Sequence, residues 1–99
     1  MEIRIQSIHF DASDQLQSFI EKKVSKLAKY YDEIRSAEVT LKVTKPETAL
    51  NKEAGIRLVV RNDELFATKT CDTFEESVDT CTEALSKQLV KYKEKLRDK

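Results

Sequence analysis

Apolar and polar residues alternate along four short segments of the chain, and a period of two residues is typical of half-buried β-strands. The clearest segment is 37–44, where Ala37, Val39 and Leu41 face one way and polar residues face the other. One polar face per strand predicts a sheet that helices cover on one side only. The four predicted strands are residues 2–10, residues 37–44, a strand that begins at residue 56, and residues 64–71.

Local signals mark the ends of these strands. The alternation of the first strand shifts by one residue at Ser7, which predicts a bulge or a twist there. Pro46 removes a ladder donor and ends the second strand, and a polar loop is expected over residues 46–54. Asn62-Asp63 favours a tight hairpin turn before the last strand, because both residues tolerate left-handed backbone.

Two longer segments repeat apolar residues every three or four positions and are predicted to be amphipathic helices. The first follows Ser13, its predicted N-cap, and runs to about residue 31. The second has about 24 residues and begins with a capping box, made either by Thr73 with Glu76 or by Asp72 with Glu75. The stripes predicted to hold the helices to the sheet are Leu16, Phe19, Ile20, Val24, Leu27 and Tyr31 in the first helix, and Phe74, Val78, Cys81, Leu85, Leu89, Tyr92 and Leu96 in the second.

These elements predict the order β-α-β-β-β-α in one domain, residues 1–99. The first β-α-β unit is expected to be a right-handed crossover between parallel strands, and the later strands an antiparallel meander. Both helices are expected to pack on the apolar face of a four-stranded mixed sheet. The predicted fold class is therefore α+β, a two-layer α/β sandwich.

The composition offers little for catalysis, metal binding or a cofactor. His9 is the one histidine of the sequence, and no motif gives it a nucleophile or converging metal ligands. Cys71 and Cys81 lie ten residues apart, which is not zinc-ligand spacing, and we expect them to be reduced thiols. We therefore expect neither an enzyme nor a metal or cofactor site. Because no apolar run is long enough to span a membrane, a cytoplasmic location is expected.

Basic residues gather on the outer faces of both predicted helices, although the 18 basic and 18 acidic residues of the chain cancel. At about 100° per residue, Lys22, Lys26 and Lys29 lie roughly opposite the apolar stripe of the first helix, with Lys23 on its flank. The second helix is acidic in its first turns, and residues 84–99 hold six basic and two acidic side chains. The candidate binding residues are Lys22, Lys23, Lys26, Lys29, Lys87, Lys91, Lys93 and Lys95.

Each basic stripe alone is explained equally well by an ordinary solvated surface, since an acid-to-base gradient complements the helix dipole. Two stripes on helices that share one sheet face would form a ridge of about eight positive charges, which attracts a polyanion. Because the stripes are nearly all lysine, they suit phosphate contact rather than base readout in DNA. Aromatic stacking residues are scarce, since Tyr92 belongs to the core stripe and Phe66 to the open sheet face. Structured RNA recognised by shape and backbone is the preferred partner.

Two segments add a family resemblance. Residues 13–34, SDQLQSFIEKKVSKLAKYYDEI, combine a cap, an amphipathic helix, spaced basic residues and an aromatic pair before Asp32. Residues 72–89, DTFEESVDTCTEALSKQL, precede KYKEK at 91–95. With these segments the chain resembles, over essentially its whole length, the ribosome hibernation-promoting factor and ribosome-associated translation inhibitor family, also called sigma-54 modulation proteins.

The resemblance implies a fold similar to double-stranded RNA-binding domains and a function as a ribosome-binding domain. Family members bind the small ribosomal subunit in the channel used by mRNA and by tRNA at the A and P sites. They contact ribosomal RNA through basic residues of both helices, block translation and store ribosomes under stress or in stationary phase. The matching basic positions in this chain are Lys23, Lys26 and Lys29 in the first helix and Lys87, Lys91 and Lys93 in the second.

The chain also departs from the family pattern. Ala84 and Val90 stand where many members have a basic residue, and Lys95, Arg97 and Lys99 are candidates to compensate. The sequence ends just after the second helix, like short forms without a dimerising domain, so we expect a monomer off the ribosome.

Three hypotheses follow. The first is a ribosome-bound translation inhibitor, the second a module for another structured RNA, and the third an adaptor whose charged helices bind an acidic protein. Neither DNA nor a membrane is expected as a partner.

Overall fold

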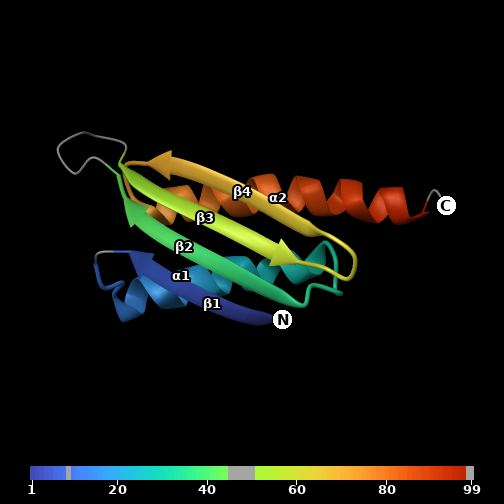
Figure 1. The fold of residues 1–99 in the computed structure, drawn as a ribbon, viewed down its shortest axis with the longest axis horizontal. Helices are drawn as coiled ribbons and strands as arrows, with labels where there is room; N and C mark the ends of the chain where they lie inside the picture. Colours follow the sequence, from blue (N-terminus) through green and yellow to red (C-terminus); the bar gives the residue numbers. More distant parts are fainter. Residues whose placement is uncertain (9, 45–50, 98–99) are drawn as a thin grey trace.

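The computed structural model of this chain describes residues 1–8, 10–44 and 51–97, with side chains as far as residue 96. Four strands, two α-helices and one 3₁₀ helix follow one another in the described residues (Figure 1). In chain order they are β1 (Glu2–Ile8), α1 (Asp14–Ser25), the 3₁₀ helix η1 (Lys26–Lys29), β2 (Ser36–Val43), β3 (Lys52–Val59), β4 (Glu64–Cys71) and α2 (Phe74–Arg97).

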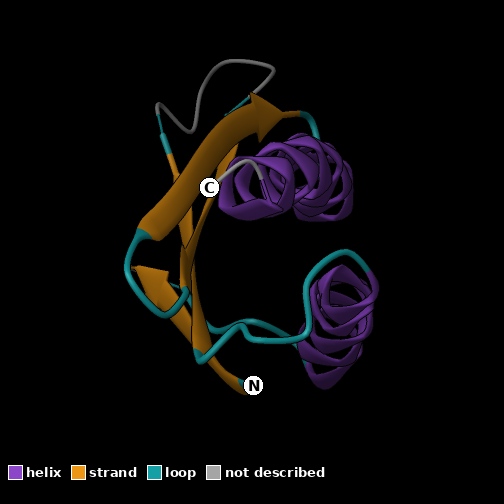
Figure 2. Ribbon diagram, turned by 90° about the vertical axis from the view of Figure 1, so that its right-hand side faces the viewer, coloured by secondary structure: helices purple, strands orange, loops and turns teal. Residues whose placement is uncertain are grey.

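The strands form one sheet in the order β1-β2-β3-β4. β1 and β2 are parallel, while β3 pairs antiparallel with both β2 and β4. Both helices lie on the same face of this sheet, as the end-on view in Figure 2 shows. The predicted α+β fold, with a four-stranded mixed sheet and both helices on one face, is confirmed.

The first strand is regular at Ser7, where the sequence predicted either a bulge or a twist. β1 pairs with β2 without interruption from Glu2 opposite Ser36 to Ile8 opposite Lys42, so these seven pairs contain no bulge at Ser7. Phe10 lies beyond the end of the strand, and its ring stacks on Phe74 with centroids 4.9 Å apart. The shift in alternation therefore marks the end of the strand, because Phe10 packs as a loop residue.

The third strand begins earlier than the sequence predicted. β3 starts at Lys52 rather than at residue 56, and Ala54 is fully buried. Gly55 hid this part of the alternation because it has no side chain to count on either face. The hairpin turn is also one residue earlier than predicted, since the Val60 amide donates to the Asp63 carbonyl at 3.0 Å and leaves Arg61-Asn62 as the central pair. The predicted strand end at Pro46 lies outside the described residues.

The first helix is shorter than predicted and ends in a tighter turn. Ser13 is its N-cap, as predicted, and the Ser13 hydroxyl accepts a hydrogen bond from the Leu16 amide at 3.1 Å. α1 ends at Ser25, and η1 replaces the last α-helical turn. Tyr31 nevertheless reaches the core, where its ring meets Tyr92 edge to face at 5.3 Å.

The second helix spans 24 residues, as predicted, and it is capped by Thr73. The Thr73 hydroxyl accepts from the Glu76 amide at 3.1 Å. The helix buries its apolar stripe as far as Leu89 but not at its end, where Leu96 is 42% exposed. Leu96 was predicted to hold the helix to the sheet, and this is wrong because the last turns of α2 extend past the sheet (Figure 1).

Polar contacts connect α2 to the two strands beneath it. The buried Ser77 hydroxyl donates to the Lys52 carbonyl, with the Thr73 carbonyl 3.0 Å away. The Cys81 thiol donates to the Ala54 carbonyl at 3.2 Å. At the outer strand, the Gln88 amide donates to the Phe66 carbonyl at 3.1 Å. These contacts fix the rotation and the position of α2 on β3 and β4.

Both cysteines are free thiols, as expected, with Cys81 buried and Cys71 half-buried. Within the described part of the chain, no helix combines the length and the apolar character needed to cross a membrane.

Two leucines of the same predicted stripe should differ in their effect on stability. Leu89→Ala removes a fully buried side chain and should lower the free energy of unfolding by about 2–5 kcal/mol. Leu96→Ala, the matched control, should lower it by no more than about 0.5 kcal/mol because Leu96 is exposed. Urea unfolding followed by circular dichroism measures both. Equal losses for the two variants would contradict the described end of the buried stripe.

Alkaline pH should destabilise the fold through Cys81. Burial raises the pKa of this thiol to about 11, above that of an unfolded chain. Its contribution to stability is therefore present below about pH 8.5 and is lost as the pH rises towards 11. From pH 8 to 11 the wild type should lose about 2–3 kcal/mol more than Cys81→Ala, with Cys71→Ala behaving like the wild type. Parallel curves for wild type and Cys81→Ala would contradict this role.

Candidate nucleic-acid interface

A groove runs between the first helical segment, α1 with η1, and α2. Three hollows line up along it within the described residues, and each is lined from both sides. We define the inter-helix groove by the residues of these hollows: Lys23, Lys26, Leu27, Lys29 and Tyr30 from the first segment, and Asp79, Thr82, Glu83, Ser86, Lys87, Val90, Lys91, Lys93 and Glu94 from α2.

The groove gathers six of the eight candidate lysines of the described chain. Lys23, Lys26 and Lys29 line it from one side, because α1 and η1 turn this face towards α2. Lys22 and Lys95 are exposed, but neither lines the three hollows of the groove. The lysines on the α2 side of the groove are Lys87, Lys91 and Lys93.

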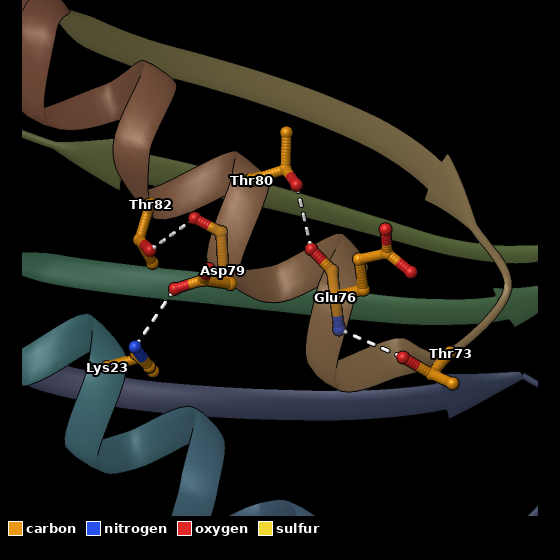
Figure 3. A network of polar contacts seen from close by, with 6 residues as sticks. All are labelled: Lys23, Thr73, Glu76, Asp79, Thr80 and Thr82. Atoms are coloured by element: carbon orange, nitrogen blue, oxygen red, sulfur yellow. Dashed lines mark hydrogen bonds and ion pairs between the residues drawn. The ribbon is translucent and has the colours of Figure 1, made fainter.

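One end of the groove is locally neutral, which the sequence did not show. The Lys23 ammonium forms an ion pair of 2.9 Å with the Asp79 carboxylate across the groove (Figure 3). The same ammonium lies 5.6 Å from the centre of the Phe19 ring. Glu83 lines the hollow beside this pair. The acidic first turns of α2 thus face the lysines of α1 and lower the positive potential at this end.

The hydroxyl groups near Asp79 are engaged with the helix itself (Figure 3). Thr80 donates to the Glu76 carbonyl at 2.8 Å, and Thr82 donates to the Asp79 carbonyl at 2.9 Å. These bonds leave the Asp79 carboxylate as the group that reaches across to Lys23.

The other end of the groove is basic and open. Lys29, Lys87, Lys91 and Lys93 are all exposed there, and none forms an ion pair with another described residue. Glu94 is the acidic side chain among the described residues of the two hollows at this end. Unpaired ammonium groups at a surface are suited to contact with phosphate oxygens, because they gain a partner without losing one.

The open face of the sheet has its charges paired more closely. Arg57 forms ion pairs with Glu38 and, at 3.8 Å, with Glu64. Phe66 lies on this open face, as the sequence predicted, and its side chain is 57% exposed. The lysines at the basic end of the groove have no such ion-pair partner among the described residues.

The two positions that depart from the family pattern differ in their surroundings. Ala84 is half-buried and packs against the core, so its short side chain fits the seam between helix and sheet. Val90 is 42% exposed and lines the basic end of the groove. Tyr30 lines all three hollows and was missed by the sequence reasoning, which placed its neighbour Tyr31 in the core but gave Tyr30 no role.

No group of three or more His, Cys, Asp or Glu side chains that could hold a metal ion occurs among the residues whose structure is described. His9 lies outside those residues. The described residues of the groove are mainly charged side chains, with one exposed aromatic ring, Tyr30, among them.

Residues 3–97 match the family of the sigma 54 modulation protein / S30EA ribosomal protein. The chain belongs to this family. It is 30% identical to a ribosome hibernation promoting factor of Azotobacter vinelandii over 96% of this chain and 85% of that protein. It is 28% identical to the factor of the same name from Escherichia coli over 98% of both chains. The family resemblance seen in the sequence is thereby confirmed.

Solved structures agree with the family assignment. A ribosomal subunit interface protein from Coxiella burnetii has a TM-score of 0.84 at 26% identity, over 94% of this chain and 98% of that one. The N-terminal domain of Thermus thermophilus Protein Y has the same fold, with a TM-score of 0.79 at 19% identity, over 93% and 99% of the two chains. Sigma 54 modulation family members are non-enzymatic ribosome hibernation factors, in agreement with the expectation that the chain is not an enzyme.

Removing the acidic partner of Lys23 should strengthen binding to a polyanion. Asp79→Asn frees the Lys23 ammonium and should tighten binding to a structured RNA about twofold to fivefold, as expected for one exposed ion pair. Glu75→Gln, in the first turn of the same helix and away from the groove, makes the same charge change and is the control. Fluorescence anisotropy at low salt measures both. Equal gains would show that net charge, rather than the groove, controls affinity.

Proposed function

We propose that this chain is a ribosome hibernation factor that binds the small ribosomal subunit through the lysines of the inter-helix groove. The proposed site is the mRNA channel together with the A and P tRNA sites, where the bound protein blocks translation and keeps idle ribosomes intact. The observation that carries the proposal is that lysines from both helices line one groove in a member of a family whose named relatives are ribosome hibernation promoting factors.

The mechanism is occlusion rather than chemistry. Exposed ammonium groups at the basic end of the groove attract phosphates of ribosomal RNA, and release of counterions contributes to the affinity. Lysine suits this task because its charge is a point contact that does not require one orientation of the phosphate. The folded domain then fills space that mRNA and tRNA need. Translation stops because those ligands compete with it for one site.

The remaining expectations follow from this mode of action. The protein acts in the cytoplasm, where ribosomes are, and needs no cofactor. It binds as a monomer, because a single groove supplies the contact. A different structured RNA and an acidic protein partner are the two alternatives, and ribosome binding separates them from the proposal.

The direct experiment is sedimentation with purified bacterial ribosomes and separated subunits on sucrose gradients at low salt. The protein should migrate with the small subunit and with whole ribosomes, but not with the large subunit. It should leave the small subunit as salt is raised, with a slope that reflects the number of phosphate contacts. A protein that stays at the top of the low-salt gradient contradicts the proposal.

Charge reversal in the groove should abolish this binding. Replacing Lys87, Lys91 and Lys93 together with Glu should weaken binding to the small subunit by at least about a hundredfold, because three phosphate contacts are lost and repulsion replaces them. In vitro translation should then proceed uninhibited. The fold should remain, since all three side chains are exposed.

A matched control uses three exposed cations outside the groove: Lys42, Arg61 and Lys69, each replaced with Glu. This variant has the same net charge as the groove variant and should still sediment with the small subunit. If both variants lose binding to the same degree, the groove is not the site.

A further inference from the structure

The basic end of the inter-helix groove has an apolar floor. Tyr30 is 43% exposed and Val90 is 42% exposed, and both line the same hollow of about 470 Å³. Lys87 and Lys91 border this hollow on one side. Lys29 and Lys93 border the adjoining hollow, which Tyr30 and Val90 also line. An exposed aromatic ring thus shares these two hollows with Glu94 and with four lysines that form no ion pair with another described residue.

The fold does not require Tyr30 to occupy this position. The tight turn of η1 sends Tyr31 into the core and Tyr30 outward, and the Tyr30 amide completes the turn by donating to the Leu27 carbonyl at 3.0 Å. The hydroxyl of Tyr30 makes no hydrogen bond to any other described residue. Tyr30 belongs neither to the buried core of the described residues nor to the half-buried side chains that pack against it.

Contacts between lysines and phosphates do not require an exposed apolar surface such as that of Tyr30 and Val90. A regular RNA duplex presents phosphates, 2′-hydroxyls and base edges to a protein, while its base faces remain stacked inside the helix. An unpaired nucleotide presents a free base face, and that face stacks on aromatic side chains. Lysines on both sides of the ring are placed to contact the phosphates that precede and follow such a nucleotide.

We propose that Tyr30 is a stacking platform for an unpaired nucleotide of the RNA bound in the groove, with Val90 as the apolar wall beside it. The site therefore prefers RNA with an unpaired nucleotide to a continuous duplex of the same charge. This inference rests on the proposed function and names the RNA feature that the groove selects. Val90, which stands where many family members have a basic residue, contributes shape and apolar contact here rather than charge.

The test uses two fluorescently labelled RNA hairpins with equal numbers of phosphates, one fully paired and one with a two-nucleotide bulge. The wild type should bind the bulged hairpin more tightly. Tyr30→Ala should lose roughly tenfold in affinity for the bulged hairpin, which is within the range for removal of a base-stacking aromatic side chain. Its affinity for the paired hairpin should change little. The salt dependence should keep its slope, because the lysine–phosphate contacts remain.

Matched variants separate stacking from other contacts. Tyr30→Phe and Tyr30→Trp keep an aromatic ring and should retain the preference for the bulge. Tyr30→Leu keeps an apolar side chain but has no ring, and it should lose the preference for the bulged hairpin. Urea unfolding checks that the variants fold, which is expected because Tyr30 is an exposed residue. The fluorescence of a 2-aminopurine base placed in the bulge should be quenched when the RNA binds the wild type. It should not be quenched when the RNA binds Tyr30→Leu.

The outcomes distinguish this inference from the proposed function. If the lysine-to-glutamate variant loses ribosome binding while Tyr30→Ala keeps the preference for the bulge, the stacking role alone is overturned. If Tyr30→Leu keeps both the affinity for the bulged hairpin and the preference for it, apolar contact rather than stacking accounts for the binding. That result also overturns the stacking role. If the wild type binds neither RNA hairpins nor ribosomes, both the stacking role and the proposed function are wrong.

Discussion

The packing of α2 on β3 and β4 is the contact on which the rest of the structure depends. Its buried stripe, which includes Val78, Cys81, Leu85 and Leu89, excludes water from the middle of the sheet. Apolar burial alone leaves a helix free to rotate or slide by small amounts, because that force has no direction. Hydrogen bonds from Ser77 and Gln88 to strand carbonyls remove this freedom, since they are satisfied at one position only. The groove inherits its geometry from this seam, because one of its two walls is the outer face of α2.

The charge along the groove is graded, and the gradient has a structural cause. Acidic residues suit the beginning of a helix and basic residues its end, so α2 alone is polarised along its axis. α1 and η1 present lysines along the whole groove, and the described ion pair between these segments and α2 lies near the start of α2. Lys23 is paired in this way, whereas Lys29 is not. A neutral chain thereby carries a positive region of limited length, which confines where a polyanion can bind.

Much of the fold could be predicted from the sequence because hydrophobic periodicity reports which face of each element is buried. The caps at Ser13 and Thr73 were predictable for the same local reason, since the hydroxyl and the amide it accepts from lie three residues apart. The predicted element boundaries were wrong where the side-chain pattern does not report burial on the sheet. Gly55 carries no side chain, Phe10 packs outside its strand, and Leu96 continues a stripe after the sheet beneath it has ended. The lysines of the candidate site could be listed from the sequence, but the groove that six of them line could not be predicted. The pairing of Lys23 with Asp79 and the outward position of Tyr30 depend on how two distant segments meet.

The extension of α2 past the sheet has a thermodynamic consequence. Lys87, Lys91 and Lys95 follow one another at four-residue intervals, and like charges at this spacing repel and weaken a helix. Nearer its start the helix is held by the sheet, but its last turns have no such support. On the proposed function, phosphates bound at Lys87 and Lys91 remove the repulsion between these two residues as well as forming new contacts. On the proposed function, RNA binding is therefore linked to the stability of the second half of α2, because the bound state favours its helical form.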